Sequence, residues 1–185
     1  MKNFKERISI PAKNYAEALI EIAQDGVMTY NEIYEDLTSI QDILDMAPEL
    51  SEVLINPTVS YDIKADITNE IFQKEVQQPI LNFLKILIDK KRFQEFSQIR
   101  AAYINKLNKI NNIQPVSVTS AVELTDEQKK NIIGKLEEKL KKQVQPLWNI
   151  DENIIAGLVV KINDDVIDTS LKNKINKISK ELLLR

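Results

Sequence analysis

The sequence predicts an α+β protein, in which a six-helix N-terminal bundle is followed by a small C-terminal α/β domain. Apolar residues recur at intervals of three and four through residues 1–107, the spacing of amphipathic helices. After residue 115, β-branched residues alternate with polar ones or form short runs, as they do in strands. Only three Gly and six Pro interrupt the 185 residues, and this favours long helices.

The two parts of the chain differ in composition. Residues 1–105 hold 11 Lys/Arg and 17 Asp/Glu, whereas residues 106–185 hold 14 and 11, and ten of the eleven aromatic residues lie in the first part. Between them, the Asn-rich segment 108–115 ends in a proline and breaks the helical pattern. We therefore expect a bundle over 1–107, a linker over 108–115 and an α/β domain over 116–185.

Composition also limits the possible chemistry. The chain has no Cys and no His, which removes disulfides, thiolate ligands and the commonest general base. It has no Gly-rich phosphate loop, and Asp164, Asp165 and Asp168 offer too few oxygen ligands for a calcium loop. We therefore expect no enzyme, no cofactor, no bound metal and no small-molecule substrate.

The N-terminal helices have recognisable starts. Ser9 is expected to cap a helix with Pro11 in its first turn, and Thr29 with Glu32 has the spacing of a capping box. The stripe of the first helix comprises Ala12, Tyr15, Ala16, Leu19, Ile22 and Ala23. Ser60 is expected to cap a helix that carries Ile63, Ile67 and Ile71. The helix after Pro79 is apolar on nearly every side, which indicates that other helices or a partner cover it.

The C-terminal domain is expected to alternate strands and helices. Val116–Thr119 and Pro146–Ile150 are typical of strands, and Thr125 with Gln128 forms a second capping box. That helix directs Ile132, Ile133, Leu136 and Leu140 inward. The longest apolar run, Ile154–Ile162, predicts a strand buried on both faces.

After that run, Asn163–Asp165 predicts a turn and Val166–Ile167 a returning strand. Oxygen atoms of Asp168, Thr169 and Ser170 can accept hydrogen bonds from the N–H groups that begin a last helix. One face of that helix carries Leu171, Ile175, Ile178 and Leu182.

The helix after Thr125 is rich in lysine, so a nucleic-acid-binding or regulatory helical protein is an alternative hypothesis. Few aromatic residues lie among these lysines, and Glu137 and Glu138 dilute their charge. This pattern favours a solvated face that docks an acidic partner helix. Salt-dependent binding to a duplex or a single strand would support the alternative.

Several motifs resemble one known family. They are Tyr15-Ala16-x-Ala18-Leu19, Asn56-Pro57, Asn82-Phe83-Leu84, Val118–Thr125, and a C-terminal signature comprising Asp151, Ile154, Ile155, Ala156, Gly157, Asp168 and Ser170. In order and spacing they resemble the F-type ATP synthase delta subunit (OSCP) family, in its cyanobacterial and plastid branch. The family usually has Gly where Ala156 stands and a smaller residue where Thr169 stands, and we expect only a small local adjustment.

The resemblance implies a non-catalytic peripheral-stalk (stator) subunit, which links the catalytic head to the stalk helices and resists rotor torque during proton-driven ATP synthesis. The N-terminal helix of an alpha subunit would bind between the first and fifth helices. Tyr15, Ala16, Leu19, Phe83, Leu84 and Leu87 would line that groove. The C-terminal domain would contact b-type stalk subunits, and nucleic acid would not be a partner.

The resemblance also implies a location. No apolar segment typical of a secretory signal follows Met1–Arg7. The family implies a peripheral membrane protein, on the stromal face of a chloroplast thylakoid membrane or the cytoplasmic face of a bacterial plasma or thylakoid membrane.

Overall fold

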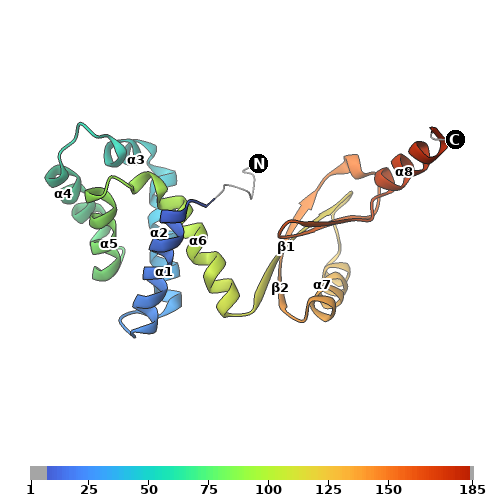
Figure 1. Ribbon diagram of the computed structural model, residues 1–185, viewed down its shortest axis with the longest axis horizontal. Helices are drawn as coiled ribbons and strands as arrows, with labels where there is room; N and C mark the ends of the chain where they lie inside the picture. Colours follow the sequence, from blue (N-terminus) through green and yellow to red (C-terminus); the bar gives the residue numbers. More distant parts are fainter. Residues whose placement is uncertain (1–7, 184–185) are drawn as a thin grey trace. The chain divides into compact units, whose positions relative to one another are not determined.

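The computed structural model describes the backbone of residues 8–183 and the side chains of residues 8–179. Met1–Arg7, considered above for a signal segment, and the side chain of Leu182 lie outside the described residues. The chain divides into two compact units, Met1–Leu107 and Asn108–Arg185. Figure 1 shows a helical N-terminal unit and a C-terminal unit built around a sheet.

The described residues of the N-terminal unit form six α-helices, as the sequence predicts. They are α1 (Ile10–Gln24), α2 (Tyr30–Met46), α3 (Pro48–Ile55), α4 (Tyr61–Phe72), α5 (Gln78–Asp89) and α6 (Phe96–Ile110), with the short 3-10 helix η1 (Phe93–Glu95) before α6. α6 continues three residues past the boundary of the unit, into the segment expected to be a linker.

The predicted caps begin two of these helices. Ala12 N donates to Ser9 Oγ over 3.1 Å at the start of α1, where Pro11 lies in the first turn. At α2, Glu32 N donates to Thr29 Oγ1 over 3.2 Å, and Thr29 N donates to Glu32 Oε2 over 2.6 Å. These bonds satisfy N–H groups that have no partner inside the helix. Ser60 stands at the N-cap of α4, but its side chain accepts no capping hydrogen bond there.

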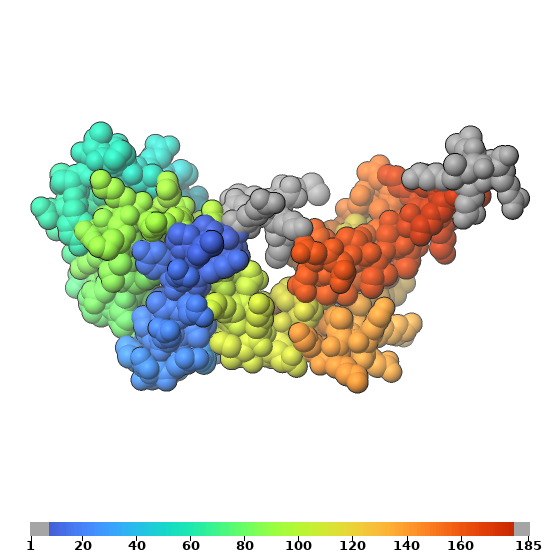
Figure 2. All heavy atoms as spheres, in the orientation of Figure 1, coloured from blue at the N-terminus to red at the C-terminus, as the bar shows by residue number. Residues whose placement is uncertain are grey.

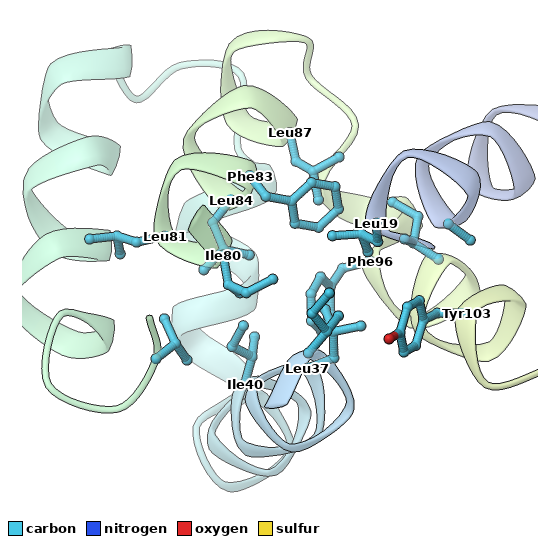
Figure 3. Close-up of a cluster of buried hydrophobic side chains, with 14 of the residues drawn as sticks. Leu19, Leu37, Ile40, Ile80, Leu81, Phe83, Leu84, Leu87, Phe96 and Tyr103 are labelled. Atoms are coloured by element: carbon cyan, nitrogen blue, oxygen red, sulfur yellow. The ribbon is translucent and has the colours of Figure 1, made fainter. Parts of the chain in front are cut away.

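The N-terminal core lies between α1, α2, α5 and α6. Figure 3 shows Leu19, Leu37, Leu84, Phe96 and Tyr103 directed toward one another from these helices. Each of these side chains is at most 2% exposed. Tyr103 Oη also donates to the carbonyl oxygen of Tyr30 over 2.9 Å, so α6 is tied to the start of α2.

The most buried side of α4 lies one position beyond the stripe of Ile63, Ile67 and Ile71, although Ile71 also packs against the core. α4 buries Lys64, Thr68 and Phe72, whereas Ile63 is 54% exposed. The large Phe72 ring thereby joins the core, and Lys64 is only 7% exposed. Burial and the nearby charge of Lys91 lower the pKa of Lys64.

The C-terminal unit has a four-stranded sheet in the order β2-β1-β3-β4. Its elements are β1 (Ile113–Ser120), α7 (Asp126–Leu140), β2 (Gln143–Ile150), the 3-10 helix η2 (Glu152–Ile154), β3 (Leu158–Ile162), β4 (Asp165–Asp168) and α8 (Leu171–Leu183). β1 and β2 are parallel, and the other two pairs are antiparallel. α7 connects the parallel strands, as such pairs require.

α7 packs on one face of this sheet. Alternate residues of β1 are buried, and Val116 and Val118 form a cluster with Leu136 of α7. Ile132, Ile133 and Leu140 pack against the same cluster, as the sequence predicts.

Two segments differ from expectation. The strand predicted over Ile154–Ile162 begins only at Leu158, and it is not buried on both faces because Lys161 is exposed. A side-chain cap from Asp151 turns the preceding residues into η2 instead. The segment 108–115 consists of the end of α6, a turn at residues 111–112 and the start of β1. Asn112 ends the helix because it adopts a φ of 55°.

Candidate functional site

The two predicted groove helices meet through an aromatic pair. The rings of Tyr15 on α1 and Phe83 on α5 have their centroids 6.1 Å apart and cross at 71°, an edge-to-face arrangement. Tyr15 is half-buried, and Phe83 is 7% exposed. Lys90, one residue past α5, has its pKa raised chiefly by its hydrogen bond to Asp89, and Tyr15 is near enough to contribute.

The other four predicted groove residues lie in the interior. Ala16, Leu19, Leu84 and Leu87 have no exposed surface. They pack α1 against α5, and Leu19, Leu84 and Leu87 point into the core in Figure 3. A partner could reach Tyr15 and the edge of Phe83, but it could not reach these four without moving the helices apart.

Sequence reasoning missed the residues that remain accessible beside the pair. On α5, Ile86 follows Phe83 by three residues and is 49% exposed. On α1, Ala18 is exposed and Ile22 half-buried, three and seven residues after Tyr15. We call Tyr15, Ala18, Ile22, Phe83 and Ile86 the α1–α5 surface. The sequence did contain a signal for Ile86. The other apolar residues of α5 are enough to fill its core side, so Ile86 is an extra apolar residue that can remain at the surface.

The acidic residues of the C-terminal signature stabilise the backbone. Asp151 Oδ1 accepts hydrogen bonds from the backbone N–H of Asn153 and from its side-chain amide, which lowers the pKa of Asp151. Asp168 Oδ1 accepts from Ser170 N over 2.9 Å, and the hydrogen bonds of Ser170 lower the pKa of Asp168. Ser170 Oγ in turn accepts from Asn173 N and caps α8.

Thr169 has a different role from the predicted helix cap. Its hydroxyl donates to the carbonyl oxygen of Leu158 over 2.7 Å, so it joins the end of β4 to β3. Ala156, where the family usually has Gly, has no positive φ, and a methyl group is therefore compatible with its backbone. Gly157 is the residue with a φ of 89°.

Ile155 has a strained backbone. Its φ is 69° and its ψ is −56°, and Ala156 N donates to the carbonyl oxygen of Ile154 over 2.9 Å across it. This is the rarer form of the γ-turn, which is costly for a β-branched residue.

The last helix carries an apolar stripe at the surface. Leu171, Ile175 and Ile178 are between 42% and 57% exposed and lie along one side of α8. Figure 2 shows the atoms of α8 on the outside of the C-terminal unit. The fourth predicted member, Leu182, has its side chain outside the described residues. Contiguous exposed apolar surface of this kind marks interaction sites.

The described residues show neither a metal site nor a membrane-spanning helix. Residues 8–179 contain no group of three His, Cys, Asp or Glu side chains placed to hold a metal ion. None of the described helices combines the length and the apolar character needed to cross a bilayer.

Comparisons with known proteins agree on one family. The family model described as "ATP synthase delta (OSCP) subunit" matches residues 12–182. The chain is 38% identical to a chloroplastic ATP synthase subunit delta of Galdieria sulphuraria, over 89% of this chain and 93% of that one. It is 36% identical to the subunit delta of Prochlorococcus marinus, over 91% and 93% of the two chains.

A third relative, the subunit delta of Chlorobaculum tepidum, is 31% identical over 95% of this chain and 96% of its own. Among solved structures, a chain of the Toxoplasma gondii mitochondrial ATP synthase hexamer has the same fold. It superposes with a TM-score of 0.71 at 17% identity, covering 95% of this chain and 98% of that one.

Proposed function

The chain belongs to the ATP synthase delta (OSCP) subunit family, and from this premise we propose that it joins an alpha subunit of the catalytic head to b-type helices of the peripheral stalk. It is a structural subunit of the ATP synthase stator. It catalyses no reaction itself and resists the torque of the rotor during proton-driven ATP synthesis.

The observation that carries the alpha-subunit contact is the edge-to-face pair of Tyr15 and Phe83 with its accessible apolar neighbours. An amphipathic helix binds by laying apolar side chains, three and four residues apart, into an apolar surface. The α1–α5 surface offers Ala18, where a helix backbone could approach closely, and the exposed Ile86. The N-terminal helix of an alpha subunit is the proposed ligand.

The α8 stripe supports the stalk contact. Leu171, Ile175 and Ile178 are spaced for a helix partner, and the first nine residues of α8 carry Lys172, Lys174 and Lys177, whereas its one acidic residue, Glu181, comes later in the helix. An acidic stalk helix would match this charge. The location follows from the same assembly: a peripheral protein on the stromal face of a thylakoid membrane or the cytoplasmic face of a bacterial membrane.

Calorimetric titration of the full chain with a peptide from the N-terminus of the cognate alpha subunit tests the first contact. We expect saturable one-to-one binding, and Ile86→Asp should weaken it by about tenfold or more because it places a charge on the apolar surface. Ile63→Asp on α4 is the matched control, since Ile63 is 54% exposed, close to the 49% of Ile86, but lies outside the α1–α5 surface. If the two variants weaken binding equally, the α1–α5 surface is not the binding site.

A further inference from the structure

The sheet of the C-terminal unit has open edges. In the order β2-β1-β3-β4, β2 lies at one edge and β4 at the other. β1 adds a third open stretch, because it pairs with β2 from Ile113 onward but with β3 only from Ser117 onward. An edge strand presents unpaired N–H and C=O groups, with which a strand of another chain can pair. Each open stretch is therefore a possible site of association between molecules.

Exposed apolar side chains lie on both edge strands. On β2, Leu147 is 46% exposed and Ile150 is 59% exposed, and on β4, Val166 is 56% exposed. Unpaired backbone groups beside apolar side chains are the combination that promotes association of sheets. β2 has eight residues and β4 has four, so β2 is the longer template for a second strand.

The outward backbone groups of β2 can be assigned. Along a strand, residues that bond to one neighbour alternate with residues whose N–H and C=O groups point away from it. A proline is tolerated in a sheet where its nitrogen faces away from the neighbouring strand, and Pro146 lies in the middle of β2. Val144 N donates to Glu137 Oε1 of α7 over 3.0 Å, which also directs it away from β1. The outward set is therefore Val144, Pro146, Trp148 and Ile150.

Half of this outer edge is closed to a second strand. The N–H of Val144 is occupied by Glu137, and Pro146 has no N–H at all. Among the described residues of β2, the outward N–H groups left for another strand are those of Trp148 and Ile150. A strand that paired along the whole edge would leave its own carbonyl groups opposite Val144 and Pro146 without donors, and unsatisfied groups of this kind oppose pairing.

The other open stretches carry the same kind of closure. Pro115 of β1 lacks an N–H, and its carbonyl oxygen accepts a hydrogen bond from Gln114 Nε2 over 3.1 Å. The same amide nitrogen donates to Asn163 Oδ1 over 3.1 Å. At the end of β4, the carbonyl oxygen of Asp168 accepts from Asn173 Nδ2 of α8 over 3.2 Å. Side chains from α7, β1 and α8 thus cover the three open stretches of one sheet.

We propose that these contacts prevent the sheet from pairing with the sheet of a second copy of this chain. The closure matters most at β2, where an unprotected chain would pair antiparallel with β2 of another copy about a twofold axis. Each residue of such an interface is used twice, so each closed position is lost twice. The α1–α5 surface and the α8 stripe lie elsewhere, and the inference does not depend on the contacts proposed for them.

Sedimentation equilibrium of the full chain tests the closure. Glu137→Ala frees the N–H of Val144, and Pro146→Val adds an N–H at the next outward position. The double variant should self-associate about tenfold or more tightly than the natural chain, because each new hydrogen bond forms twice in the symmetric dimer. Glu138→Ala with Gln145→Val is the matched control. It makes similar side-chain changes one position away, adds no outward donor, and should associate no more tightly than the natural chain.

Amide hydrogen exchange identifies the surface that associates. The N–H groups of Trp148 and Ile150 should exchange rapidly in the natural chain and slowly in the double variant, where they donate to the second strand. If the double variant does not fold, Pro146→Val alone is measured in the same way, since it keeps the bond between Glu137 and Val144. A folded variant that stays monomeric, or one that associates while these two amides still exchange rapidly, overturns the proposal. A natural chain that already dimerises through them overturns it as well.

Discussion

Gly157 and Thr169 lie in direct backbone contact. A Cβ atom on Gly157 would stand 2.6 Å from the carbonyl oxygen of Thr169, well inside van der Waals distance. Two hydrogen bonds hold this region together: Thr169 N donates to Leu158 O over 2.9 Å, and Leu171 N donates to Ala156 O over 2.8 Å. The contact therefore lies where the start of α8 is joined to residues 156–158.

Gly157→Ala should lower the free energy of unfolding of the C-terminal unit by about 2 kcal/mol, because the methyl group meets backbone and the residue keeps a positive φ. Chemical denaturation followed by circular dichroism measures the change. Gly134→Ala is the matched control, since Gly134 lies in α7 with open space around its Cβ position. That control should raise stability by up to about 1 kcal/mol.

The hydrogen bond that Asp36 accepts should contribute more to the stability of the fold than its negative charge does. Its Oδ2 accepts from Gln77 N over 2.9 Å, at the start of α5. Asp36→Ala leaves that part-buried N–H without its side-chain partner and should reduce stability by about 1 kcal/mol. Asp36→Asn can still accept the bond, so it should be at least as stable as the natural chain at pH 7.

The natural chain and the Asp36→Asn variant should differ in how their free energies of unfolding depend on pH. Burial raises the pKa of Asp36 above its model-compound value of 3.8, against the effect of the Gln77 hydrogen bond, and the charges of Glu32 and Glu35 add to the increase. The folded state therefore favours the protonated carboxyl, so ionisation destabilises the fold as pH rises through the raised pKa. The stability advantage of Asp36→Asn should shrink as pH falls toward 3.8. An advantage that grows on acidification would contradict this account.

Tyr103 should make alkaline unfolding steeper. Burial raises the pKa of its phenol, so the folded state resists ionisation while the unfolded chain ionises near the ordinary value of 10.0. Stability is then lost as pH rises above that value. Tyr103→Phe should reduce stability by about 1 kcal/mol at pH 7, through loss of the bond to Tyr30 O. When the unfolding temperature is measured as a function of pH, the Tyr103→Phe variant should also show a smaller decrease above pH 10 than the natural chain does.

The division of the chain into two domains predicts that each folds alone. Fragments 1–110 and 111–185 keep every helix and strand whole, and each contains its own apolar cluster. We expect both to unfold cooperatively, with the shorter fragment melting at the lower temperature because a smaller unit buries a smaller share of its surface. Differential scanning calorimetry measures both. A fragment without a transition would show that its elements depend on the other part.

Much of the fold could be predicted because local signals agreed with the tertiary structure. Ser9, the Thr29–Glu32 box and the Thr125–Gln128 box each begin a helix where the spacing predicts it. The strand over Ile154–Ile162 was predicted too long because an apolar run does not reveal a turn within it. The side chain of Asp151 and the γ-turn at Ile155 end the extended conformation there, and both depend on three-dimensional contacts.

The candidate site was harder to predict because burial is a property of the packed bundle. Helical spacing places Leu19 and Leu84 on the facing sides of α1 and α5, but it cannot say whether that interface is open. The structure fills it with these side chains and leaves Ile86 accessible at its edge.

Only the two turn residues 111–112 connect the end of α6 to the first residue of β1. A tether of two residues gives little slack, since each extended residue spans at most about 3.6 Å. In the proposed assembly, a stalk contact made by the C-terminal unit would keep the α1–α5 surface near the alpha subunit at a high effective concentration. Two contacts of ordinary strength would then act as one long-lived attachment, which a stator needs through many turns of the rotor.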